Sequence, residues 1–282
     1  MDSLFILLQH LLPQHLLSRV VGALAELRHP QWLKNWLIAR FAAHFKVDMS
    51  EAAESDLHSY DNFNHFFTRA LREGARPVVD ADVVCPADGV ISQIGCVDAD
   101  SIFQAKGRGY STTTLLGGDR KQAERFRNGR FATIYLSPRD YHRVHMPVGG
   151  RLTGTCYIPG DLYSVNGTTA EHVDRLFARN ERLVCYFDTA CGPMAMVLVG
   201  AMIVAGIETV WDGQVAPPPH SIQARDYTRL RQIELEKGEE MGRFKLGSTV
   251  ILLFPEGVLG WEQQYQAGTQ TRMGQALARV VS

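Results

Sequence analysis

The sequence predicts an α+β protein in which N-terminal amphipathic helices precede a predominantly β core of mostly antiparallel sheets. Two changes of pattern along the chain support this fold class. Apolar residues recur every three or four positions through the first 47 residues, which is the period of a helix. From about residue 84 the period shifts toward two, and short apolar runs are separated by glycine and proline, as in strands joined by turns.

Three amphipathic helices are expected in the N-terminal region. Leucines at helical spacing mark the first helix over residues 4–12, with Ser3 as N-cap and Pro13 as a stop. The same spacing continues over residues 16–27, and a third stripe that contains two tryptophans covers residues 32–41.

The N-terminal region also differs from the rest of the chain in charge. Residues 1–47 hold five basic and two acidic residues, a local charge of +3, and Trp32 and Trp36 are suited to an interface. Two interpretations stay open, a helical layer packed on the domain core and a platform on a membrane surface. Both can hold together.

The remaining chain carries five strand candidates, which are the apolar runs at residues 84–95, 131–137, 183–187, 197–210 and 249–254. A helical stretch near residues 172–179 and a polar, charged linker near residues 216–242 separate some of these runs. The sequence has no internal repeat and no low-complexity segment, and the core is expected to be β-rich.

Composition excludes several classes of protein. The 282 residues are 45% apolar and 21% charged, which is typical of a globular protein of one large domain or two small ones. The formal net charge of −1 provides no basic field for gripping nucleic acid. Five cysteines without a Cys-x-x-Cys pair argue against a zinc site or a redox dithiol and favour a reducing compartment.

Neither a signal peptide nor a transmembrane helix is expected. The first basic residue is Arg19, whereas a secretory signal opens with positive charge. Residues 189–207 lack formal charge over about the length of a membrane span, but Gly192, Pro193 and Gly200 interrupt them. This stretch therefore predicts buried strands of a compact core.

Asp88 is the first residue that could carry chemistry. It lies in the segment Pro86-Ala87-Asp88-Gly89, between a proline turn and a glycine, in an otherwise apolar strand. The carboxylate could cap a turn or orient a base, and the residues alone leave both roles open.

Two histidines form the second candidate group. His142 and His145 lie three residues apart in a segment bracketed by prolines, on one side of a helical turn or on opposite faces of a strand. No further ligand cluster supports a metal site, and no metal is predicted. Acid–base work is the better functional interpretation, because imidazole titrates near neutral pH.

Ser248 is the third candidate. It follows Gly247 in a polar turn that leads directly into an apolar strand. The turn is not a nucleophile elbow, because position 250 is valine where that motif needs glycine. A serine, histidine and aspartate set can still be assembled from Asp88, His145 and Ser248.

These three segments resemble, in this order, motifs of the bacterial membrane-associated phosphatidylserine decarboxylases. The matching stretches are Pro86–Gly89, Tyr141–Pro147 and Phe244–Thr249, with further similarity at residues 104–107, 157–161, 176–182 and 207–209. The similarity runs from about residue 59 to the end of the sequence. The N-terminal region is similar only in character, as apolar amphipathic helices.

The resemblance implies a pyruvoyl-dependent proenzyme that cleaves itself between Gly247 and Ser248 into chains 1–247 and 248–282. Asp88, His145 and Ser248 would form the self-cleavage triad, and Ser248 would become the pyruvoyl cofactor. That group would form a Schiff base with phosphatidylserine and release CO2 to give phosphatidylethanolamine. By analogy with the family, His142 is the candidate for protonating the carbanion during decarboxylation.

We therefore expect a helical membrane-association region, residues 1–47, and a β-rich catalytic domain, residues 48–282. The expected partners are phosphatidylserine, the membrane surface and the protein's own two cleavage chains, with a homodimer left open and no nucleic acid. The expected location is the cytoplasmic face of the bacterial cell membrane, as a peripheral protein.

Two alternatives compete with this interpretation. A serine hydrolase acting on lipids would use the same triad and would stay as one chain. A non-catalytic lipid-binding module would use the N-terminal platform, but it would leave the histidine and serine segments unexplained.

Overall fold

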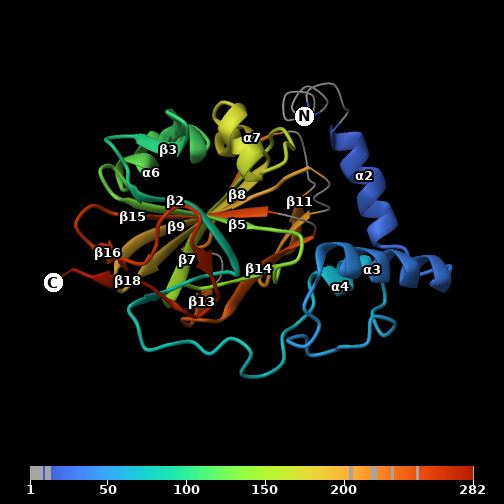
Figure 1. Ribbon diagram of the computed structural model, residues 1–282. Coiled ribbons are helices and arrows are strands. Elements are labelled where there is room, and N and C mark those ends of the chain that lie inside the picture. The colour runs from blue at the N-terminus through green and yellow to red at the C-terminus, as the bar shows by residue number, and fades with distance from the viewer. Residues whose placement is uncertain are drawn as a thin grey trace.

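The computed structural model describes residues 9, 14–202, 206–216, 221–229, 232–245 and 248–281 (Figure 1). The first expected helix, residues 4–12, lies outside the described residues except for Gln9, and Gly247 lies outside them altogether.

A large antiparallel sheet forms the centre of the molecule. Among the described residues it has nine strands, and β13 (Glu234–Leu235) pairs with β7 beside the main path. The main path runs β12 (Gln223–Asp226), β7 (Gly150–Ile158), β8 (Arg182–Thr189), β9 (Gly192–Val199), β15 (Ser248–Phe254), β5 (Arg130–Leu136), β2 (Gly89–Cys96) and β17 (Gln270–Thr271). Every pairing in it is antiparallel, which confirms the predicted sheet type.

Both faces of this sheet are buried, and β15 shows why its sequence is apolar without interruption. Val250 and Leu252 point into one hydrophobic cluster, whereas Ile251 and Leu253 point into a second cluster on the other face. Side chains alternate between the two faces of a strand, so a strand covered on both sides needs apolar residues at every position.

Smaller sheets cover one face. A four-stranded sheet has the order β11 (Gly213–Ala216), β10 (Gly206–Thr209), β14 (Glu240–Lys245) and β6 (Arg143–His145). A three-stranded sheet has the order β1 (Val83–Val84), β18 (Ala276–Val280) and β16 (Leu259–Trp261). Phe244 of the first and Leu277 of the second belong to the same buried cluster as Val250.

A hairpin and short helices cover the other face (Figure 1). The hairpin pairs β3 (Ser101–Ala105) with β4 (Arg108–Ser111). The helices are α5 (Thr112–Leu115), α6 (Arg120–Glu124), α7 (Gly167–His172) and α8 (Leu176–Arg179). Ile102, Leu115 and Phe177 pack from this layer into the second cluster.

Three expectations about single elements are wrong. The helix expected near residues 172–179 is two short helices, α7 and α8, because Val173 takes an extended conformation between them. The run at residues 197–210 contributes to two strands, β9 and β10, which belong to different sheets. The linker expected at residues 216–242 contains β12 and β13, which both pair with β7 at one side of the large sheet. Strand β12 is exposed at three of its four positions, so its sequence lacks the apolar alternation that marks a strand.

The N-terminal helices lie to one side of the β core (Figure 1). Helices α2 (Gln14–Ala25) and α3 (Gln31–Phe45) confirm the second and third expected helices, and α4 (Phe63–Phe67) follows them. Ile38 and Ala42 of α3 pack with Tyr60 and Phe66 in a small third cluster.

The inner face of α3 differs from the expected apolar stripe. Trp32 and Trp36 are 71% and 58% exposed, whereas Lys34 is buried and donates hydrogen bonds to the carbonyls of His58 and Tyr60. A lysine can line an inner face when carbonyls satisfy its ammonium group. Among the described residues no helix combines the length and the apolar character needed to span a membrane.

Candidate active site

The large sheet brings Asp88 and Ser248 to the same end. Strand β2 begins at Gly89, β5 ends at Leu136 and β15 begins at Ser248. In this sheet Tyr135 of β5 pairs with Val90 on one side and with Thr249 on the other. Neighbouring strands lie about 4.8 Å apart. The start of β2 and the start of β15 are therefore separated by a single strand.

The smaller four-stranded sheet brings the histidines to this end as well. The backbone N–H of Phe244 in β14 donates to the carbonyl of His142 at 3.0 Å, four residues before Ser248. The backbone N–H of His145 in β6 donates to the carbonyl of Pro86 at 2.8 Å, two residues before Asp88. The histidine segment therefore lies between the two other candidate segments.

His145 is held by two hydrogen bonds. Its Nδ1 lies 2.8 Å from the carbonyl oxygen of Gly238, and its Nε2 lies 3.0 Å from the hydroxyl of Tyr141. A carbonyl only accepts, so Nδ1 carries the proton and Nε2 accepts from Tyr141. Burial lowers the pKa of His145, which favours the neutral ring. The imidazole is thus oriented as a base whose lone pair is on Nε2.

Asp88 is bound by groups other than His145. Both carboxylate oxygens accept from Nε of Arg76 at 3.0 Å, and one also accepts from Nη2 at 2.5 Å. The backbone N–H of Met273 donates to the same carboxylate at 2.8 Å. A guanidinium fork matches a carboxylate better than an imidazole does. The expected contact between Asp88 and His145 is therefore not formed, and the carbonyl of Gly238 orients the ring instead.

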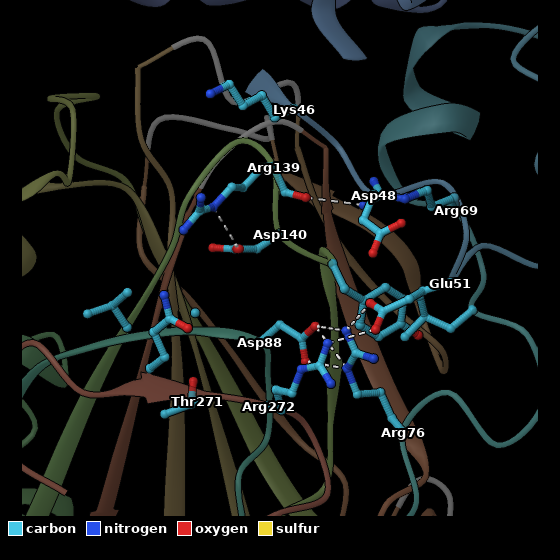
Figure 2. A pocket seen from close by; sticks show the side chains of 15 residues that line it. Lys46, Asp48, Glu51, Arg69, Arg76, Asp88, Arg139, Asp140, Thr271 and Arg272 are labelled. Carbon is cyan, nitrogen blue, oxygen red and sulfur yellow. Dashed lines mark hydrogen bonds and ion pairs between the residues drawn. The ribbon is translucent and has the colours of Figure 1, made fainter. Parts of the chain in front are cut away.

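Arg76 extends this ion pair into a network (Figure 2). Its Nη2 also lies 2.6 Å from Glu51, and Arg272 lies 2.7 Å from the other oxygen of Glu51. The network joins residues from the N-terminal part of the chain to residues close to its C-terminus.

His142 is fully buried beside aromatic carbon. Its ring centroid lies 4.0 Å from that of Phe67, and its Nδ1 donates to the carbonyl of Asp140 at 2.8 Å. Burial lowers the pKa of His142 to about 3, so the ring is neutral at physiological pH. Its Nε2 has no partner among the described residues. This nitrogen is therefore a free acceptor at the end of the sheet.

Ser248 is buried and its hydroxyl is uncommitted. The Oγ atom has no hydrogen-bond partner among the described residues, although the residue is fully buried at the start of β15. A buried hydroxyl without a partner is unfavourable and is often a sign of a functional group.

A charged cavity of about 370 Å³ lies beside Asp88 (Figure 2). Its charged lining residues are Lys46, Asp48, Glu51, Arg69, Arg76, Asp88, Arg139, Asp140 and Arg272. Sequence reasoning missed Arg69 and Arg76. The only available signal, for Arg69 alone, was an arginine two residues after the aromatic pair Phe66 and Phe67, because arginine near an apolar cluster is rarely buried unless it is paired.

Comparison with known proteins identifies the family of the chain. A family model described as phosphatidylserine decarboxylase matches residues 63–279, and a model described as PSD matches residues 4–46. Proteins named phosphatidylserine decarboxylase proenzyme are similar over nearly the whole chain. The one from Ectopseudomonas mendocina (strain ymp) is 57% identical over 280 residues, with 98% of each chain covered. The one from Azotobacter vinelandii is 55% identical over 282 residues, with 99% of this chain and 98% of the relative covered.

These similarities define the class of protein, which is a pyruvoyl-dependent carboxy-lyase that is made as a proenzyme and cleaves itself. The chain belongs to the phosphatidylserine decarboxylase family. It decarboxylates phosphatidylserine to phosphatidylethanolamine with a pyruvoyl group that forms from an internal serine. Family membership sets aside the serine hydrolase and the non-catalytic lipid-binding module.

Proposed function

We propose that Ser248 is the internal serine, and that the chain is cleaved between Gly247 and Ser248 into chains 1–247 and 248–282. The observation that carries this assignment is the buried Ser248 hydroxyl without a partner, at the start of β15 and at the same end of the sheet as Asp88 and the histidines. An uncommitted hydroxyl is free to act as a nucleophile.

The cleavage begins with an attack of the serine on the preceding peptide bond. Oγ of Ser248 bonds to the carbonyl carbon of Gly247, the C–N bond between the two residues breaks, and the Ser248 nitrogen takes up a proton. A base then removes the Cα proton of Ser248 and the Cβ–Oγ bond breaks, so Gly247 leaves as a carboxylate that keeps Oγ and a Cα=Cβ double bond remains. Water replaces the nitrogen, which leaves as ammonia, and a pyruvoyl group remains at the start of the small chain.

His145 is the proposed base for this attack. The carbonyl of Gly238 fixes the proton on Nδ1, so Nε2 can accept the proton of the serine hydroxyl in place of that of Tyr141. The negative charge of Asp88 favours the protonated form of His145 and so stabilises the charge that develops on it. Arg76 and Met273 hold that carboxylate in place.

His142 is the proposed acid–base group of decarboxylation. The pyruvoyl group supplies an electron sink for the electrons left when CO2 departs. The burial of His142 excludes water, and its free Nε2 can hold a proton for the substrate carbon. A substrate carboxylate close by would raise the low pKa of this ring and help to protonate it.

Residues 1–47 are the proposed docking region for the anionic cytoplasmic face of the cell membrane, and residues 48–282 the catalytic domain. The exposed residues Leu16, Val20 and Leu24 recur every four positions along α2, and Trp32 and Trp36 are exposed on α3. Exposed basic side chains lie on these helices at Arg19 and Arg40, in the connection between them at Arg28 and at the C-cap of α3 at Lys46. Apolar and basic surface together is typical of helices that lie on anionic lipid.

One pair of variants tests the choice of serine. Ser248→Ala should stay as one chain on a denaturing gel and should have no decarboxylase activity. Thr249→Val is the matched control, because Thr249 is the next residue, is equally buried and also has a hydroxyl without a partner. It should still cleave. Cleavage of Ser248→Ala at the wild-type position would contradict the assignment.

A further inference from the structure

Arg69 is a buried guanidinium without the partners that such a group needs. The residue is only 4% exposed, and within the described part of the chain its one hydrogen bond runs from Nη2 to the carbonyl of Arg139 at 3.2 Å. Among the described residues its Nε and Nη1 have no hydrogen-bond partner and no carboxylate lies within ion-pair distance of it. The central carbon of the guanidinium lies 5.7 Å from the centroid of the Phe66 ring, a contact that leaves the N–H groups free. A buried charge without a partner is costly, so its retention points to an anion that binds there.

The charged cavity beside Asp88 is the space that Arg69 faces (Figure 2). Most charges of its lining are already paired. Arg76 and Arg272 pair with Glu51 and Asp88, and Arg139 lies 3.9 Å from Asp140. The remaining acid, Asp48, accepts two hydrogen bonds from Ser50.

Two cations, Arg69 and Lys46, and the Asp48 carboxylate have no ion-pair partner among the described residues, which leaves a net positive charge. The two cations lie at different depths. Arg69 forms part of the buried wall, whereas Lys46 is exposed at the C-terminal end of α3. The cavity therefore has a buried cation with free donors and a second cation at its rim, next to the helix that carries Trp32 and Trp36.

Arg69 is also held next to the histidine segment. The ring of Phe67, two residues earlier, packs on His142, and Arg143 donates from Nε to the carbonyl of Thr68 at 2.9 Å. An anion on Arg69 would thus be bound beside the residues proposed for catalysis.

We propose that Arg69 forms an oxyanion subsite for the phosphodiester of the phosphatidylserine headgroup, a role that rests on the function proposed above. The free N–H groups on Nε and Nη1 lie on different edges of the planar guanidinium, so each can donate to a separate oxygen of a bound oxyanion such as the non-bridging oxygens of a phosphodiester. A cavity of about 370 Å³ is within the range of ordinary small-molecule sites.

The chemistry of the reaction favours the phosphodiester over the carboxylate as the ligand of Arg69. A carboxylate paired with arginine would be stabilised before the reaction and would lose that stabilisation as CO2 departs, which raises the barrier. The charge of the phosphodiester does not change during decarboxylation. Binding it stabilises ground state and transition state equally, and this affects KM rather than kcat.

The test measures KM and kcat of Arg69→Gln with a soluble short-chain phosphatidylserine. Losing a hydrogen-bonded charge pair should raise KM about 10- to 100-fold, with kcat per cleaved molecule changed little. Arg69→Lys keeps the charge but lacks the separate donors of the planar guanidinium and should give an intermediate KM. The matched control is Arg151→Gln, which removes an exposed arginine of β7 outside the cavity and should leave KM unchanged.

Three competitors identify the anion. Glycerophosphoethanolamine has the phosphodiester without the carboxylate, L-serine has the carboxylate without phosphate, and inorganic phosphate has the oxygens without the headgroup. Competition by glycerophosphoethanolamine should weaken at least tenfold in Arg69→Gln, whereas that by L-serine should not change. Loss of L-serine competition instead, or inorganic phosphate competing as strongly as glycerophosphoethanolamine, would overturn the proposal.

Cleavage on a denaturing gel separates this proposal from the assignment of Ser248. Normal cleavage of Arg69→Gln with wild-type KM and competition would refute the subsite alone, whereas cleavage of Ser248→Ala would refute the assignment of Ser248 alone. If Arg69→Gln does not fold, Arg69→Lys decides the question, because unchanged KM and competition in that variant would also refute the subsite.

Discussion

The two histidines differ in what their ring nitrogens contact, and this difference predicts different defects. Nε2 of His145 faces the Tyr141 hydroxyl, whereas Nε2 of His142 is free. His145→Ala should accumulate as uncleaved precursor, and Asp88→Asn should do the same because it removes the charge that favours protonated His145. His142→Ala should still cleave but should lose about 10²- to 10⁴-fold in turnover.

Two measurements on each variant check this division of roles. They are the fraction cleaved on a denaturing gel and the CO2 released per cleaved molecule. Equal cleavage defects in both histidine variants would mean that the segment acts as one structural unit, and normal turnover in His142→Ala would remove that residue from the mechanism.

Burial of the histidines also predicts how stability depends on pH. The pKa of His142 is lowered from 6.5 to about 3, and that of His145 is lowered as well. Below pH 6.5 the unfolded chain therefore binds more protons than the folded protein, and stability falls as the pH falls. Each such histidine contributes up to about 1.4 kcal/mol per pH unit.

Urea unfolding of Ser248→Ala, which should stay as one chain, measures this effect between about pH 6.5 and pH 5, where few carboxylates titrate. Adding His142→Phe should reduce the slope of unfolding free energy against pH by about one proton. An unchanged slope would show that His142 does not resist protonation in the folded state.

At the residue scale, the motifs around Asp88, His142, His145 and Ser248 make these residues candidates, and the structure brings their three segments to the same end of the large sheet. The sequence could not predict that Asp88 binds Arg76. That contact depends on how the chain before β1 folds back over the end of the large sheet, and no local pattern encodes such a return.

At the scale of elements, the exposed apolar residues of α2 predict how the protein meets a membrane. Each basic residue near an anionic surface contributes about 1 kcal/mol, and burial of a leucine-sized side chain contributes about 1.5–3 kcal/mol. Replacing Leu16, Val20 and Leu24 by serine should therefore reduce binding to anionic vesicles more than high salt does.

Vesicle flotation measures this binding. The control is Ile222→Ser with Val281→Ser, which removes exposed apolar residues outside the N-terminal region. It should float like the wild type. If the α2 variant floats equally well, the helices are only a layer packed on the core.

The bounds of a strand could be predicted where every residue of an apolar run is buried in the same sheet. They could not be predicted where one apolar run is shared between two sheets. Strand β15 is covered on both faces, so its apolar run is continuous and its bounds follow from the sequence. Strands β9 and β10 lie in one apolar run but in different sheets. Their separation depends on tertiary packing, which the local period does not reveal.

At the scale of the whole molecule, the proposed cleavage would leave the fold intact. Strand β15, the first part of the small chain, pairs with β5 on one side and β9 on the other, and both belong to the large chain. Met273 and Arg272 of the small chain also bind Asp88 and Glu51 of the large one. The two chains would therefore remain associated without the peptide bond.

The mass of the chains in active, denatured enzyme tests the central claim most directly. The account predicts two species, residues 1–247 and residues 248–282, and the small chain should be lighter than the unmodified peptide in the way that replacing its N-terminal serine by a pyruvoyl group requires. It should also resist Edman sequencing, because a pyruvoyl terminus has no amine. A single full-length species in active enzyme, or a small chain that begins with an ordinary serine, would contradict the account.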